Sequence, residues 1–168
     1  MALARWIAAL AMAILSGFAL HAHAEPVQGE IFAALEGKWQ AEGEAFGAPA
    51  RTEMQWSPAL DGRFQRIDYR IVMQRGESEQ SFVGIGHYRM VAPDHADGYW
   101  VDNSGDMHPL SATLTATGIE TIWGIAGGKQ GRTRYALRED GRVEITDWLL
   151  TDAGWKEFNH SIVSRIAE

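Results

Sequence analysis

Cysteine is absent from the 168 residues of this sequence. Disulfide bonds, cysteine metal sites and catalysis by a thiolate are therefore excluded. A chain without disulfides depends on the packing of its core, and large aromatic side chains are available for that purpose. Six tryptophans follow residue 24: Trp39, Trp56, Trp100, Trp123, Trp148 and Trp155.

Basic residues are also scarce. Fifteen Lys and Arg oppose 22 Asp and Glu, which gives a net charge of −7 with neutral histidines. Only Arg132 and Arg134 lie within two positions of each other. Because this balance repels phosphate backbones and anionic lipid surfaces, the sequence predicts no nucleic-acid partner.

A long apolar run occurs only at the N-terminus, in Trp6–Leu20. Arg5 is the only charge in residues 1–24, and Ala22-His23-Ala24 has the small-x-small form of a cleavage site. A membrane anchor needs about 20 apolar residues, and this run is shorter. We therefore expect a signal peptide at 1–24 and one soluble, periplasmic or secreted domain at 25–168, without stable membrane insertion. That domain has 144 residues and a net charge of −8.

Helical periodicity is confined to one short segment after this run. Apolar residues recur at helical spacing over Val27–Leu35, which predicts a short amphipathic helix able to plug one end of a barrel. From Gly37 the period becomes two, as residues 65–73 show, and the segments are separated by turns such as Asp61-Gly62 and Asp140-Gly141.

About ten such segments follow one another, which predicts an all-β fold with strands in up-and-down order. These strands close most easily into an antiparallel barrel, since closure removes exposed edges; an open β-sandwich is the alternative. Gly84 and Gly86 predict a bend or bulge within the strand Ser81–Met90. Residues 91–98, with Pro93, are predicted to form a surface loop.

Short motifs along the chain carry a family resemblance. They are Gly37-x-Trp39, Leu60-Asp61-Gly62-Arg63-Phe64, Gly84-x-Gly86-x-Tyr88, and Trp100-Val101-Asp102 followed by Gly105. Together they resemble an uncharacterised family of bacterial lipocalin-like (calycin) domains, related to fatty-acid-binding proteins and haem-binding nitrobindin-like barrels. The resemblance covers nearly all of 25–168 and implies a ten-stranded barrel with an internal cavity. The Thr-Asp-Tyr signature of the lipocalins proper is absent.

The same resemblance implies structural roles near the two ends of the domain. Calycins often place a C-terminal Arg or Lys over the opening Trp, and Arg165 is the matching residue here. Arg165 is therefore expected to stack on Trp39, which follows Gly37, and to close the barrel end.

Aromatic residues at alternating positions are candidates for the lining of a cavity: Trp56, Tyr69, Trp123, Tyr135 and Trp148. The leading interpretation is a barrel that binds a small apolar or amphipathic molecule, oriented by polar groups such as Tyr69 or Tyr135. Alternatively, the rings fill the barrel as a solid core, and the protein is a structural or protein-interaction module.

Haem is a third interpretation. His160 shares one face of the last strand with Phe158. If that face points inward, His160 is an interior imidazole near the chain end, where nitrobindin-like barrels carry their iron ligand. A core histidine hydrogen-bonded to a backbone carbonyl or a Tyr hydroxyl is the commoner outcome. Asp102, Asp106 and His108 offer metal-ligating atoms, but their spacing matches no known ligand pattern.

Catalytic patterns are missing as well. No serine lies at a sharp turn between a strand and a helix, where a nucleophile would be placed. No predicted helix follows Gly127-Gly128 to bind phosphate, so this pair is predicted to form a hairpin turn. Carboxylates such as Asp147, Glu144 and Glu157 fall on strands where a solvated face explains them. The sequence therefore favours a protein that is not an enzyme.

Overall fold

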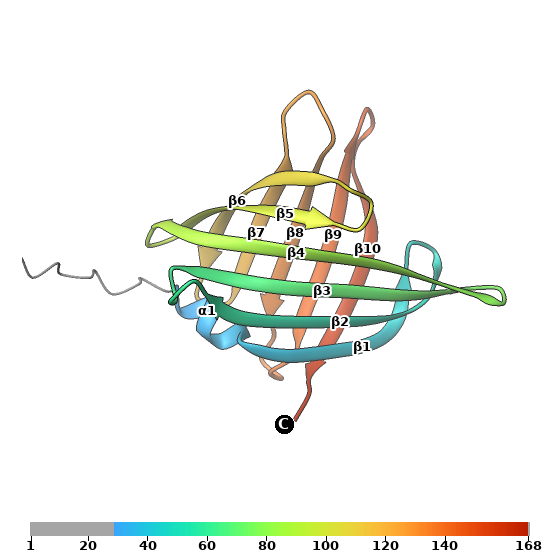
Figure 1. The fold of residues 1–168 in the computed structure, drawn as a ribbon, viewed down its shortest axis with the longest axis horizontal. Coiled ribbons are helices and arrows are strands. Elements are labelled where there is room, and N and C mark those ends of the chain that lie inside the picture. Colours follow the sequence, from blue (N-terminus) through green and yellow to red (C-terminus); the bar gives the residue numbers. More distant parts are fainter. Residues whose placement is uncertain (1–28, 168) are drawn as a thin grey trace, which may run out of the picture.

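The chain forms a closed antiparallel β-barrel with a short helix at one end (Figure 1). The computed structural model describes residues 29–167. Each strand pairs with the next one in sequence, and β1 pairs with β10 to close the ring. The predicted up-and-down barrel is confirmed, and the open sandwich is not formed. The elements are α1 (Glu30–Leu35), β1 (Gly37–Ala45), β2 (Ala48–Ala59), β3 (Phe64–Arg75), β4 (Ser78–Ala92), β5 (His95–Asp102), β6 (Met107–Thr115), β7 (Gly118–Gly124), β8 (Gln130–Leu137), β9 (Val143–Thr151) and β10 (Gly154–Arg165).

The predicted signal peptide and its cleavage site lie outside the described residues, and so do the first two residues of the predicted helix. Within residues 29–167, no helix is long and apolar enough to span a bilayer. The predicted helix is present from Glu30 onward.

Helix α1 closes one end of the barrel. Its Ile31, Phe32 and Leu35 side chains are buried in the barrel core. The last carbonyls of a helix have no partner within the helix, and here side chains from the barrel supply the donors. The Trp39 indole N–H donates to the Leu35 carbonyl at 2.8 Å, and the Arg165 Nη2 donates to the Ala34 carbonyl at 2.8 Å.

Arg165 also lies on Trp39, in the arrangement that the calycin resemblance implies. Its guanidinium carbon is 4.2 Å from the centroid of the indole, and its Nη1 donates to the Glu36 carbonyl. Gly37 has a φ of 112°, which disfavours any other residue, and a side chain there would overlap the guanidinium. These contacts hold the end of β10 against the C-terminal end of α1.

Two details of the predicted strands are wrong. Gly84 and Gly86 pair in regular register, and the register shift in β4 falls between Met90 and Ala92 instead. The predicted loop at 91–98 is much shorter, because β4 continues to Ala92 and β5 begins at His95. The glycines in β4 instead leave room for an indole of the neighbouring strand, that of Trp100.

Candidate functional site

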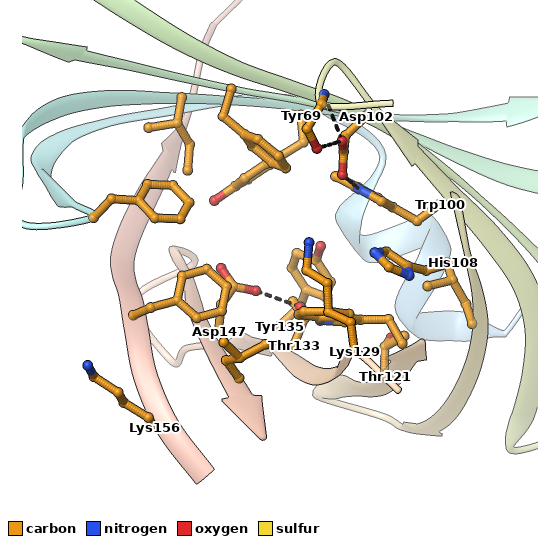
Figure 2. A pocket seen from close by; sticks show the side chains of 18 of the residues that line it. Tyr69, Trp100, Asp102, His108, Thr121, Lys129, Thr133, Tyr135, Asp147 and Lys156 are labelled. Carbon is orange, nitrogen blue, oxygen red and sulfur yellow. Dashed lines mark hydrogen bonds between the residues drawn. The ribbon is translucent and has the colours of Figure 1, made fainter. Parts of the chain in front are cut away.

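The barrel encloses a cavity of about 370 Å³, on the side of the core that lies away from α1. Its floor is an aromatic layer formed by Phe32, Trp56, Tyr88 and Tyr135. The Trp56 ring lies 5.6 Å from Tyr88 and 5.4 Å from Tyr135, whereas Phe32 packs beneath at 5.7 Å from Trp56. Tyr88 and Tyr135 face the cavity, and Trp56 lies behind them. Figure 2 shows the cavity with the side chains that line it.

Two indoles form part of the wall rather than filling the interior. Trp100 lies over Gly84 and Gly86 of the neighbouring strand, and Trp123 lies over Gly131. A Cβ atom added at Gly84 or Gly131 would overlap the indole that covers it. The rings can lie flat against the sheet only because these positions carry no side chain. The glycines therefore keep the centre of the barrel open.

Trp56 and Trp148 were predicted to line the cavity, but neither does, and Trp56 belongs to the aromatic layer beneath it. Trp148 lies outside the barrel, where the Arg132 guanidinium is 4.3 Å from its ring centroid and 5.3 Å from that of Trp155. Strand β9 turns Asp147 and Leu149 into the cavity, so the residue between them points outward. Trp148 is therefore not a lining residue, whereas Tyr69, Trp123 and Tyr135 line the cavity as predicted from their alternation.

Among the residues that the structure describes, Asp147 is the one charged residue that is buried, which overturns the expectation of a solvated face. The residue is only 9 % exposed. The Thr133 hydroxyl donates to one of its carboxyl oxygens at 2.5 Å, and the Asn159 amide donates to the other at 2.7 Å. The first of these hydrogen bonds is drawn in Figure 2. Burial raises the pKa of Asp147 above its ordinary value, and the two hydrogen bonds act in the opposite direction.

Three tyrosines carry hydroxyl groups into the same space. The Tyr69 hydroxyl accepts a hydrogen bond from Asn159 at 3.3 Å, and the Tyr88 hydroxyl lies 3.2 Å from the Thr121 hydroxyl. Tyr135 has no hydrogen-bond partner among residues 29–167, although the residue is only 4 % exposed. Burial raises the pKa of all three phenols, so they stay protonated at neutral pH and can donate.

The mouth of the cavity combines aromatic rings with a small ionic cluster. Phe46 lies in the turn between β1 and β2 with a φ of 52°, and its ring stacks on Phe158 at 5.3 Å. On the opposite rim, Lys129 forms an ion pair with Asp106 at 2.5 Å, and the His108 imidazole lies 3.6 Å from the same carboxylate. Within the described chain, no group of three or more His, Asp or Glu side chains is placed to hold a metal ion.

The prediction that His160 points into the barrel is wrong. Its side chain is 47 % exposed and lies 2.8 Å from the Glu144 carboxylate on the outer surface. The register of β10 against β9 shifts between Glu157 and Asn159, which makes Phe158 an extra residue. Phe158 and Asn159 both face inward as a result, and the alternation beyond them is reversed. His160 is thereby removed as an interior ligand of haem iron.

Sequence reasoning missed the polar group made by Asp147, Thr133 and Asn159. One signal for it was available, because Asp147 continues the alternation of Val143 and Ile145, both fully buried. An acidic residue in the inward phase of an apolar strand indicates a buried polar site. No comparable signal identifies Asn159, whose direction depends on the bulge.

Comparison of the sequence with known protein families and with curated proteins finds no match.

Proposed function

We propose that this protein is a lipocalin-like binding barrel that holds a small amphipathic molecule in its cavity and catalyses no reaction. The observation that carries the proposal is the open interior, which is preserved by laying Trp100 and Trp123 flat over glycines. A structural module with a filled core would gain stability from closing such a space, because empty volume loses packing contacts. The volume of about 370 Å³ falls within the usual range of ligand pockets.

The chemistry of the walls favours a ligand with an apolar body and one polar end. Aromatic rings and aliphatic side chains such as Phe82, Leu110 and Leu149 provide most of the cavity surface. The hydroxyl groups lie around the Asp147 carboxyl group. Burying a chain of eight carbons contributes about 6 kcal/mol at 0.8 kcal/mol per methylene, before the costs of association. We expect dissociation constants between about 0.1 mM and 1 mM for simple probes of this size.

Binding of 1-octanol tests this proposal through the fluorescence of the cavity tryptophans. We expect saturable quenching or a spectral shift, since Trp100 and Trp123 form part of the wall. Replacing Trp148 and Trp155 by Phe removes the signal of the two outer indoles and should leave the response in place. An unchanged spectrum with 1-octanol, in this variant and in the wild type, would contradict a binding function for the cavity.

We also propose that the protein is exported, on the basis of the apolar run Trp6–Leu20 and the Ala22-His23-Ala24 sequence that follows it. N-terminal sequencing of protein recovered from the periplasm or the medium should begin near Glu25. Exported material that begins at Met1 would contradict cleavage.

A further inference from the structure

We infer that the cavity selects ligands whose polar end is a protonated amine, and that this amine binds the Asp147 carboxylate. The inference rests on the proposed function, because it names the class of molecule that the same cavity accepts. Octylamine-like compounds, with an ammonium group on an apolar body, are the simplest members of this class.

Asp147 has unused hydrogen-bonding capacity. A carboxylate accepts about four hydrogen bonds, and Asp147 receives one on each oxygen from Thr133 and Asn159. Both donors are neutral, and in the described part of the chain no Lys, Arg or His forms an ion pair with Asp147. A buried carboxylate without a counter-charge is costly, and a ligand cation with N–H donors supplies both the charge and the hydrogen bonds.

Aromatic side chains surround the space that the Asp147 carboxylate faces. Tyr69, Tyr135, Trp100 and Trp123 line the same cavity as Asp147. Aromatic faces attract ammonium ions through their ring quadrupoles, and this attraction increases when water is excluded. A carboxylate set among aromatic rings is therefore better suited to a cation than to an anion or a neutral headgroup.

The charges elsewhere at the cavity do not reverse this preference. Lys129 lies at the mouth and is already paired with Asp106 at 2.5 Å. Lys156 also lies at the mouth, and Figure 2 shows its amine directed away from Asp147. Asp102, at the same rim, accepts a hydrogen bond from the Trp100 indole at 3.1 Å. The whole chain carries a net charge of −7, which favours the approach of cations.

The test compares three probes with the same chain and different headgroups: octylamine, 1-octanol and octanoate. At pH 7.5 we expect octylamine to bind about 10- to 100-fold more tightly than 1-octanol, the gain typical of a charge-assisted hydrogen bond. In Asp147→Asn the ratio of the two affinities should fall to about one. Glu144→Gln, which removes a carboxylate on the outer side of the same strand, is the matched control and should keep the ratio of the wild type.

A pH series on the wild type makes the same test without a substitution at Asp147. The ratio of octylamine to 1-octanol affinity should rise as the pH increases through the pKa of Asp147, since burial favours its protonated form at low pH. It should fall again near pH 10, where the amine loses its proton. The other titratable groups facing the cavity are Tyr69, Tyr88, Tyr135, Asp102, His108, Lys129 and Lys156. His108→Gln tests the histidine among them, and the rise should persist in this variant.

The outcomes separate the two proposals. If 1-octanol binds, octylamine binds no better and Asp147→Asn has no effect on their ratio, the amine inference is overturned while the binding function stands. If octanoate binds best, the polar end of the ligand is an anion held by the lysines at the mouth, and the inference is equally wrong. If none of the three probes binds at any pH, both the inference and the proposed function fail.

Discussion

Replacing Trp39 by alanine should lower the free energy of unfolding by about 3–5 kcal/mol, the usual cost of truncating a large buried ring. Trp39 is 1 % exposed, and its indole satisfies the Leu35 carbonyl at the end of α1. The substitution also removes the surface on which Arg165 stacks. Chemical denaturation followed by circular dichroism measures this loss, which is a large fraction of the stability of an ordinary domain.

Arg165 provides the matched comparison for this effect. Arg165→Lys keeps the charge and loses the planar group that reaches the Ala34 and Glu36 carbonyls, so it should cost less than Trp39→Ala but remain measurable. Trp155→Ala removes an indole of the same size that is 41 % exposed, and should cost much less than Trp39→Ala. Equal losses of unfolding free energy in Trp39→Ala and Trp155→Ala would contradict the role of Trp39 in closing this end of the barrel.

Gly131→Ala should weaken 1-octanol binding at least tenfold, because the new methyl group displaces the Trp123 indole from the wall into the cavity. The forced rearrangement should also lower the free energy of unfolding by about 1–3 kcal/mol. Fluorescence titration and chemical denaturation of the same protein measure the two effects. Combining Gly131→Ala with Trp123→Ala removes the displaced ring and should restore an open cavity.

Gly43→Ala is the control for a glycine in a strand. Gly43 lies in β1, and an added Cβ would meet nothing within 4 Å. We expect this variant to bind 1-octanol as the wild type does and to be slightly more stable, since alanine restricts the unfolded chain. If Gly131→Ala behaved like Gly43→Ala, the flat packing of Trp123 would not be what keeps the cavity open.

The barrel could be predicted from the sequence because the alternation and turn patterns agree with a closed arrangement of the strands. The alternation of Ile67, Tyr69 and Ile71 in β3 predicted the buried face correctly, and turns such as Asp61-Gly62 separated the strands. Period-two patterns of this length fix which residues face inward as long as the register is regular. No register shift interrupts the pairing of β2 with β3 or of β3 with β4.

The candidate site was harder to predict from the sequence, because two of its features depend on contacts between strands. The bulge at Phe158 reverses the alternation of β10, and it is visible only in the pairing with β9. The open interior depends on indoles of one strand covering glycines of the next, as Trp123 covers Gly131. Alternation along a single strand carries no information about either. Asp147 differs, since its inward phase was visible and only its assignment to a solvated face was wrong.

The most direct test of a ligand-binding interior is a crystal structure of the protein soaked with 8-bromo-1-octanol, with the bromine located by its anomalous scattering. We expect a bromine peak inside the barrel, between the walls formed by Trp100 and Trp123, with both indoles flat over their glycines. Bromine found only on the outer surface, together with indoles folded into the centre of the barrel, would contradict a ligand cavity in this protein.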